Sequence, residues 1–462
     1  MTNRRELLQT ALAAGPLTLS AEGIASPATA PGSATPPVPP DLQFLRREPL
    51  VNADRLRFFM KRQGLDAIIA ARPANFFYLT NHFPQLDRMG WQGAGIAIFT
   101  ADPRRPLTLV MHSFLHYYTH SPEWDAWPDR LVFPYTQPVD PAAVPADGSE
   151  PPAAAGRTMK VRDAALLSGR ENRRAEAMKL ARPVSADASW ALAKALRELG
   201  LESARVGIDE PDLRVTLAAR GFAGEITSGE DTLRWARLAK SSAELKLMRF
   251  AAQANVDAAM AAAKSVRDAG NTRGLRARFF SEAALRGNLG VFMVINGAST
   301  EVIEEPLREG MAFSIDCVSS CRFYHGDFAR TIFIGEPPAN VLRATRAVET
   351  AWGEIRSQLR AGMRFADIPR IGRESLKKQG VDFNVSFTPH SVGLFHTDHP
   401  QASLLLPRGP ESLVLEEGTV LSVDHPVLEA GLGGTVHLED LMLIGKDGAE
   451  PIHSVPPPVI SV

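Results

Sequence analysis

Two stretches in the second half of the chain share one pattern of apolar and polar positions. Residues 308–316 read REGMAFSID and residues 416–424 read EEGTVLSVD, so that in each a glycine turn leads into an apolar strand ending in a carboxylate. A second acidic strand follows each copy, over 326–335 and 437–445. Apolar residues at every second position beside glycine turns predict two antiparallel hairpins. Equivalent acids in two halves of a duplication predict one shared site.

Helical spacing precedes each hairpin. Apolar residues three and four apart predict helices over 245–270 and 275–286 before the first hairpin, and over 340–359 and 368–379 before the second. The sequence Ser241-Ser242-Ala243-Glu244 is typical of a capping box at the start of the first helix. Strands are predicted over 290–295 and 385–390. Two such helix and sheet units facing each other predict a curved sheet with helices outside.

The first half of the chain predicts an α/β domain from residue 45 to 232. An amphipathic helix is expected over 55–63, a buried strand over 67–71, and further strands over 95–100 and 107–111. His112, His116 and His120 lie four apart after the last of these strands, a spacing that places three imidazoles on one helical face. Either they bind a metal, or they belong to an aromatic-rich surface helix near the active site or a dimer contact. Residues 138–156, rich in Pro and Ala, predict an exposed loop.

The N-terminal segment is interpreted as an export signal. Arg4-Arg5 precede a short, weakly apolar run over 10–20, which is typical of a twin-arginine signal peptide over 1–30. A Pro-rich linker follows over 31–44. We therefore expect an exported, periplasmic protein, with a cytoplasmic protein as the alternative.

Composition narrows the function classes. The chain has 462 residues, 45% of them hydrophobic, and a formal net charge of −1, which together describe an ordinary protein of two or three domains. It has no basic stripe to bind nucleic acid and no apolar run long enough to span a bilayer. The two cysteines, Cys317 and Cys321, lie near the turn of the first hairpin, so that a disulfide and a pair of buried thiols both remain open.

The convergent acids predict a metal centre. Carboxylates gathered in a core repel one another and are costly to desolvate unless a cation lies among them. A pair of divalent ions meets that need; oxygen-rich sites suit Mn, Mg, Fe or Co, and an added imidazole keeps Zn open. His390, on a short strand before a glycine, is the best histidine between the two copies. The alternative is that each acid caps a hairpin at the surface.

Five residues match, in order and approximate spacing, the metal ligands of the pita-bread metallopeptidases, which include aminopeptidase P, prolidase, methionine aminopeptidase and the metal-free creatinase. They are Asp316, Asp327, His390, Asp424 and Glu439. The chain resembles this family over about 45–450. The resemblance implies a creatinase-like N-terminal domain over 45–232, a pita-bread catalytic domain with a pseudo-twofold repeat over 233–455, and commonly a homodimer.

The resemblance also implies roles for these residues. Asp316 would bind one ion, Asp327 and Glu439 would bridge both, and His390 with Asp424 would hold the other. A water between the cations would become hydroxide and attack a peptide carbonyl that one metal polarises. We therefore expect an Xaa-Pro aminopeptidase or dipeptidase acting on small peptides, with Mn²⁺ as the first candidate metal and Co, Zn or Fe as others.

Several positions depart from the family. The place of Asp424 is usually Glu, and family peptidases carry a histidine in the stretch equivalent to 291–309, where this chain has none. A family histidine seven residues after the ligand His is Thr397 here, flanked by His396 and His399, which we include among the candidate catalytic residues with His390 and Asp424. Segment 394–400 is where we expect specificity to be set.

Three more histidines adjoin the candidate ligands. His437 stands two residues before Glu439, where the family commonly has arginine, and His325 and His425 are expected to be structural or to support the ligands. The missing histidine over 291–309 and the aspartate at 424 favour an alternative function on the same fold, a creatinase-like C–N hydrolase or a lyase acting on a small zwitterion. A third possibility is a binding module without catalysis.

Overall fold

The structure is a computed structural model that describes residues 42–90, 95–119, 126–136, 139–154, 160–300, 302–401 and 408–462. The expected signal peptide over 1–30 lies outside the described residues, as does most of the linker. None of the helices in the described ranges combines the length and hydropathy that crossing a bilayer requires.

The first half of the chain forms one mixed sheet with the strand order β4-β3-β2-β1-β5-β6. Its strands are β1 (Ala67–Ala70), β2 (Ile96–Thr100), β3 (Thr108–His112), β4 (Leu131–Tyr135), β5 (Val206–Ile208) and β6 (Ile226–Ser228). β2 runs antiparallel to β1 and β3, and the other neighbours are parallel. All four residues of β1 are buried, as its continuous apolar run predicts. The three strands predicted in this region are confirmed.

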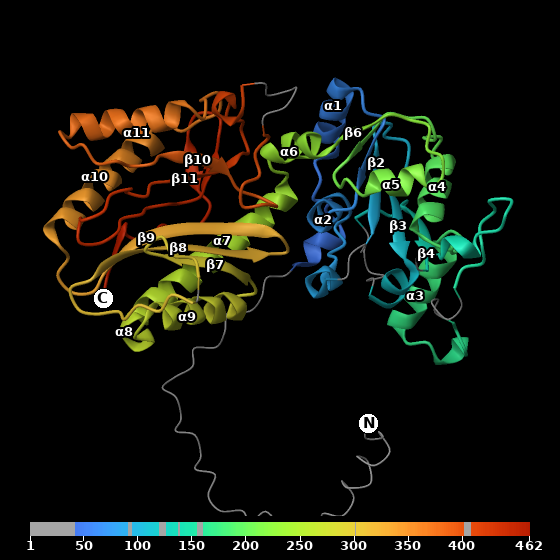
Figure 1. Cartoon of the computed structure of the whole chain (residues 1–462), viewed down its shortest axis with the longest axis horizontal. Coiled ribbons are helices and arrows are strands. Elements are labelled where there is room, and N and C mark those ends of the chain that lie inside the picture. Colours follow the sequence, from blue (N-terminus) through green and yellow to red (C-terminus); the bar gives the residue numbers. More distant parts are fainter. Residues whose placement is uncertain are drawn as a thin grey trace, which may run out of the picture. The chain divides into compact units, whose positions relative to one another are not determined.

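Helices accompany this sheet (Figure 1). They are α1 (Ala53–Gln63), α2 (Pro73–Thr80), α3 (Gly169–Leu180), α4 (Ala188–Glu198), α5 (Leu213–Ala218) and α6 (Glu230–Leu238). The predicted helix over 55–63 is confirmed as α1. It begins where the Asn52 side chain accepts a hydrogen bond from the backbone N–H of Arg55, and it ends at Gly64, whose positive φ of 66° suits glycine.

The second half contains two four-stranded sheets, in the orders β14-β9-β8-β7 and β10-β11-β12-β13. Their strands are β7 (Leu289–Ile295), β8 (Ala312–Cys321), β9 (Tyr324–Phe333), β10 (Thr388–Ser391), β11 (Val420–Asp424), β12 (Met442–Ile444), β13 (Ala449–Pro451) and β14 (Val459–Ser461). The helices are α7 (Ser242–Lys264), α8 (Val266–Ala269), α9 (Thr272–Leu285), α10 (Ala339–Arg356) and α11 (Asp367–Lys378).

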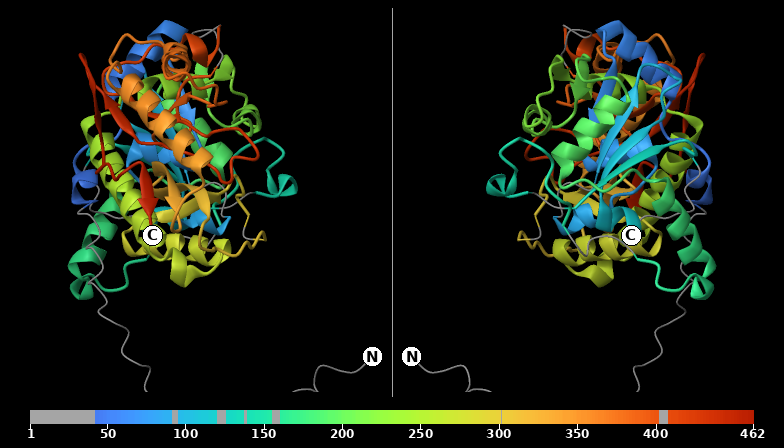
Figure 2. Two further views of the ribbon diagram at one scale, coloured as in Figure 1. Left: turned by 90° about the vertical axis from the view of Figure 1, so that its left-hand side faces the viewer. Right: turned by 90° about the vertical axis from the view of Figure 1, so that its right-hand side faces the viewer.

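Each sheet carries its own pair of helices. Residues of α7 and α9 share a core with β7, β8 and β9, and residues of α10 and α11 share another with β11 and β12. Figure 1 shows α7 and α9 on one side of the two sheets and α10 and α11 on the other, and the left view of Figure 2 shows the orange helices in front of the strands. The expected arrangement of two helix and sheet units with helices outside is confirmed.

The duplication is visible in matching hydrogen bonds. The N–H of Gly310 donates to Ile334 O at 2.7 Å, and that of Gly418 donates to Ile444 O at 2.8 Å. Both glycines have a positive φ, 81° and 87°, which explains why the turn in each copy needs glycine. The second hairpin is shorter than predicted. β12 has three residues, and Glu439 pairs only through an isolated bridge to Ala329.

The start of the second half is also as predicted. The Ser241 side chain and the Glu244 side chain form a reciprocal capping box at the start of α7. The predicted helix over 245–270 is instead two pieces, α7 and α8, which end at Gly270 with a φ of 69°.

We expect Gly326→Ala to destabilise the protein by about 1–3 kcal/mol, the usual cost of overpacking a core. A Cβ at residue 326 in β9 would lie 2.5 Å from Asn255 Cβ and 2.6 Å from Ala251 O, so that α7 would have to move. Urea unfolding would measure the change. Gly353→Ala in α10 is the control: a Cβ there meets no atom within 4 Å, and alanine should raise stability by up to about 1 kcal/mol. Equal effects of the two substitutions would contradict the close approach of α7.

The disulfide between Cys317 and Cys321, one of the two alternatives that the sequence left open, does not form. Neither Cys317 nor Cys321 is in a disulfide among the described residues; both thiols are buried, and both lie on β8. Four residues along a strand span about 13 Å, whereas a disulfide requires Cα atoms within about 7 Å. The chain reverses one residue later, at Arg322 and Phe323, which both have positive φ.

The prediction that His112, His116 and His120 share one helical face is also wrong. His112 is the last residue of β3, and His116 lies in a separate π-helical turn, Leu115–Thr119. His120 lies outside the described residues. His112 and His116 are both buried, so the alternative of a surface helix is wrong as well.

Candidate metal centre

Neighbouring strands deliver the candidate ligands to one place. Asp316 of β8 pairs with Ala329 of β9, and Ala329 is also bridged to Glu439, so that the two acids lie in one row across three segments. Residues that pair directly across strands project to the same face of a sheet. This row joins the sheet of the first copy to the segment that carries the last acid of the second copy.

His390 lies at the centre of the acids. Its Nε2 is 3.5 Å from Asp327 Oδ2, 3.4 Å from Asp424 Oδ2 and 3.5 Å from Glu439 Oε1. The ligand atoms of Asp316, Asp327 and Glu439 form a second group, within 4.8 Å of one another. The structure therefore brings together all five residues that the sequence singled out, and their role as metal ligands stays a prediction.

The donor set fits divalent cations. Asp316 Oδ1, Asp327 Oδ1 and Glu439 Oε2 are buried and have no hydrogen-bond partner among the described residues. Such atoms are costly to bury unless a cation lies beside them. Four carboxylates and one imidazole are the oxygen-rich mixture that Mn, Fe, Co or Zn accepts. Of the three overlapping groups of donors, the group of His390, Asp424 and Glu439 and the group of Asp316, Asp327 and Glu439 share only Glu439, which offers room for two ions.

The pKa values of the buried acids also indicate that the cluster needs a cation. The pKa of Asp316 is raised to about 7, mainly by burial; His437 lowers it, and the neighbouring Asp327 and Asp424 raise it. Burial also raises the pKa of Glu439 well above its ordinary value, with Asp327 and Asp424 adding to the shift. Asp316 and Glu439 thus favour their protonated forms, whereas the pKa values of Asp327 and Asp424 are lowered in spite of burial, because His396 and His390 lie beside them. A divalent ion would favour the charged form of all four acids.

Two further imidazoles reach the acids. His396 Nε2 lies 3.0 Å from Asp327 Oδ2, and His437 Nε2 lies 3.4 Å from Asp424 Oδ1. The sequence analysis included His396 among the candidate catalytic residues, whereas it noted His437 only as a departure from the family. The signal that could have found His437 is its place two residues before Glu439, because alternate residues of an extended segment face the same way.

The remaining histidines take other positions. His399 Nδ1 accepts a hydrogen bond from Ser391 N at 3.3 Å, its ring packs on Phe365, and burial lowers its pKa to about 4. His425 is fully buried, and its Nδ1 lies 2.7 Å from Leu438 O. His325 Nδ1 lies 3.4 Å from Gly393 O. A catalytic role for His399 stays a prediction.

Solvent reaches the cluster along one side. The side chains of Asp327 and Glu439 are 1% exposed, whereas those of Asp424 and His396 are 29% and 36% exposed. The ring of Phe292 in β7 lies 5.8 Å from the His396 ring, in the stretch where the family histidine is missing. A substrate would therefore meet Asp424 and His396 first.

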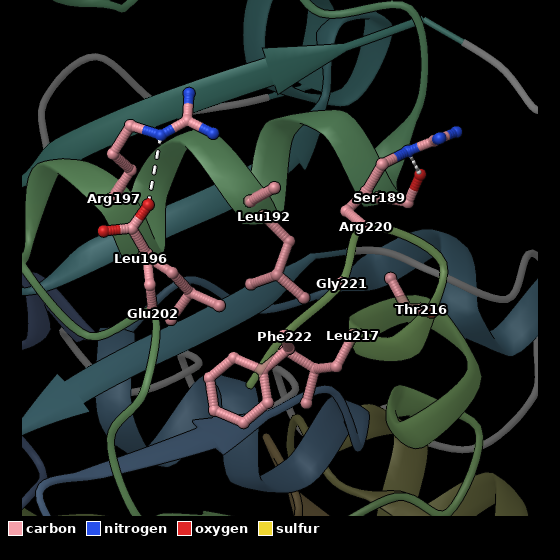
Figure 3. A pocket seen from close by; sticks show the side chains of 11 residues that line it. Ser189, Leu192, Leu196, Arg197, Glu202, Thr216, Leu217, Arg220, Gly221 and Phe222 are labelled. Carbon is pink, nitrogen blue, oxygen red and sulfur yellow. Dashed lines mark hydrogen bonds and ion pairs between the residues drawn. The ribbon is translucent and has the colours of Figure 1, made fainter. Parts of the chain in front are cut away.

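A hollow in the N-terminal half has a different character. Figure 3 shows Leu192 and Leu196 of α4 above Leu217 and Phe222, with the ion pair between Arg197 and Glu202 at one end. Polar and apolar groups line this hollow in similar measure, and it does not contain any of the metal-competent groups found among the described residues.

Comparisons with known proteins agree with the geometry. Residues 246–446, which include all five candidate ligands, match the profile of metallopeptidase family M24. The probable dipeptidase PepE of Mycobacterium tuberculosis is 26% identical over 242 residues, which cover 50% of this chain and 63% of that protein. The Xaa-Pro dipeptidase of Pyrococcus horikoshii is 24% identical over 246 residues, which cover 49% of this chain and 65% of that protein. The aligned part thus spans just under two thirds of each relative.

Among solved structures, the prolidase of Pyrococcus horikoshii OT3 superimposes with a TM-score of 0.61 at 18% sequence identity, over 87% of this chain and 98% of that one. The match extends beyond the family profile into the N-terminal half, so that the fold of both halves is shared. Residues 246–446, with the duplicated hairpins and the cluster of acids, match metallopeptidase family M24, and the described chain shares the fold of the prolidase.

Proposed function

We propose that the protein is a dinuclear-metal-dependent hydrolase that cleaves the Xaa-Pro bond of small peptides. The observation that carries the proposal is the single buried cluster of Asp327, His390, Asp424 and Glu439 with Asp316 inside a domain of family M24. The relatives named as a probable dipeptidase and an Xaa-Pro dipeptidase support a peptide substrate.

Two divalent ions would be held by both copies of the repeat. Asp316 would bind one ion, Asp327 and Glu439 would bridge the pair, and His390 with Asp424 would hold the other. When bound, the ions would polarise the peptide carbonyl and make a water more acidic. The oxygen-rich donor set favours Mn²⁺, with Co, Zn and Fe as alternatives.

The exposed side of the cluster would handle the substrate. Asp424, the ligand with the most exposed side chain, would accept a proton from the attacking water and pass it to the leaving nitrogen. His396 would donate a hydrogen bond to the oxygen of the scissile carbonyl, since its imidazole lies at the rim of the cluster beside Asp327.

The test is metal analysis of natively purified protein followed by a substrate panel. We expect about two ions per chain, by the two-metal logic of such sites, and turnover of Xaa-Pro dipeptides by Mn- or Co-loaded enzyme. Dipeptides of the same composition in reversed order, Pro-Xaa, are the matched control and should turn over poorly. Metal-loaded protein that cleaves no Xaa-Pro substrate would overturn the peptidase proposal.

A non-peptidase on the same fold is the second candidate. It is favoured by the contact of His437 with Asp424 and by Phe292 in the stretch where family peptidases carry a histidine. Turnover of creatine-like zwitterions, without cleavage of peptides, would support this non-peptidase function. Protein that binds no metal and turns over neither class would be a binding module.

Export and assembly are proposed from the sequence alone. Replacing Arg4 and Arg5 by lysines should retain the protein in the cytoplasm, because the twin-arginine pathway reads that pair. Cell fractionation with an antibody would measure this, and unchanged periplasmic protein would contradict the signal assignment. A homodimer is expected, and light scattering of the purified protein would measure its mass.

A further inference from the structure

A fully buried ion pair joins the two halves of the chain next to the metal centre. Arg237, in the last turn of α6, and Asp398, after β10, both have side chains with 0% exposure. Arg237 Nε lies 3.1 Å from each carboxylate oxygen of Asp398, and Nη2 lies 2.9 Å from Oδ1. This paired contact fixes orientation as well as distance, because the guanidinium is planar.

The other end of the guanidinium is anchored in the N-terminal half. Arg237 Nη1 donates to Asn75 Oδ1 at 2.8 Å. The amide of Asn75 in turn donates to Asp209 Oδ2 at 2.9 Å and to Glu230 Oε2 at 2.8 Å. Arg237 is therefore held by buried groups of α2 and of the segment after β5, and it cannot follow a movement of the loop after β10.

Asp398 forms two hydrogen bonds within the loop that follows β10. Its Oδ2 accepts a hydrogen bond from Leu394 N at 3.2 Å, and its N–H donates to Ser391 O at 2.8 Å. A Cβ on Gly393 would lie 2.6 Å from Asp398 Oδ2, so that glycine permits the close approach. Arg234 adds a hydrogen bond from Nη1 to Thr397 O at 2.8 Å.

His396 lies within this closed loop. Its carbonyl oxygen lies 3.2 Å from Nδ1 of the candidate ligand His390, and its own Nε2 reaches Asp327. A buried ion pair often adds little stability compared with apolar packing. What this pair adds is a defined position for the loop that presents His396 to the cluster.

We propose that Arg237 is a positioning residue that acts through Asp398 to hold His396 in its place beside Asp327. The proposal rests on the proposed function for its kinetic test, because His396 is there the group that contacts the substrate. Arg237 lies 161 residues before Asp398 and touches none of the candidate ligands in the described contacts.

The kinetic test is a double-mutant cycle in the metal-loaded enzyme. Arg237→Lys keeps the charge but loses the planar fork, and should lower kcat about 10- to 100-fold, as loss of a group supporting a metal-site residue does. His396→Gln should lower kcat by at least as much. If Arg237 acts through His396, the double variant is no slower than His396→Gln alone. If the double variant instead loses kcat by the product of the two single losses, the two residues act independently and the proposal is overturned.

A second measurement does not depend on activity. Hydrogen exchange of segment 391–399 should be faster in Arg237→Lys and in Asp398→Asn, which keeps the size of the side chain. Glu48→Gln is the matched control, since Glu48 also pairs across the two halves, with Lys246 Nζ at 2.6 Å, but its side chain is not bonded to α6 or to this loop in the described contacts. Unchanged exchange in Arg237→Lys and Asp398→Asn, or equal acceleration in Glu48→Gln, would overturn the proposal. An inactive wild type with the expected exchange pattern would refute only the peptidase function.

Discussion

Asp327→Ala is expected to abolish metal binding and to lower kcat/KM by about 10³-fold or more, at the upper end of the loss caused by removing one charge-stabilising group. Asp327 is 1% exposed and belongs to two of the three groups of possible ligands, one with His390 and His396 and the other with Asp316 and Glu439. One truncation therefore removes a donor from two of the three places at which an ion could lie.

Metal content by mass spectrometry and steady-state kinetics would measure the effect. A chelator should lower the melting temperature of the wild type, because an ion that binds only the folded state stabilises it by mass action, and should leave that of Asp327→Ala unchanged. Asp447→Ala, at an exposed turn after β12, is the matched control and should behave as the wild type. Full activity in Asp327→Ala would refute the ligand assignment.

The sequence predicted that these side chains meet because the signal was local and periodic. Asp316 and Asp327 lie in strands whose alternation fixes which face each residue takes, and Gly310 and Gly418 mark where β8 and β11 begin. His390 was expected on a short strand before a glycine, and it lies on β10. All of these expectations required information from a few neighbouring residues only.

Predictions that depended on an unmarked turn or on distant contacts failed. The reversal after β8 uses Arg322 and Phe323 in place of glycine or asparagine, so that no typical turn residue indicated that Cys321 was still in the strand. The segment that carries Glu439 pairs with β9 through one bridge instead of a full strand. Contacts such as that between Arg237 and Asp398 depend on the fold of both halves, which local patterns do not encode.

Asp424→Glu is the second substitution with a large expected effect, because Asp424 stands between two imidazoles. Its Oδ2 lies 3.4 Å from His390 Nε2 and its Oδ1 lies 3.4 Å from His437 Nε2. A side chain longer by one methylene would displace the carboxylate from at least one of them. We expect kcat/KM to fall about 10- to 100-fold, as for other disturbed contacts around a metal site.

The double variant Asp424→Glu with His437→Arg separates two explanations for this loss. The family commonly pairs glutamate and arginine at these positions, and the longer acid would then meet a flexible cation in place of a ring 3.4 Å from the native carboxylate. If aspartate and histidine are matched to each other, the double variant recovers part of the activity that the single variant loses, and the coupling shows in a double-mutant cycle. Asp447→Glu, outside the site, is the control for the added methylene. Wild-type turnover by Asp424→Glu alone would show that the contact with His437 does not constrain the length of the acid, and that a shorter side chain is merely tolerated there.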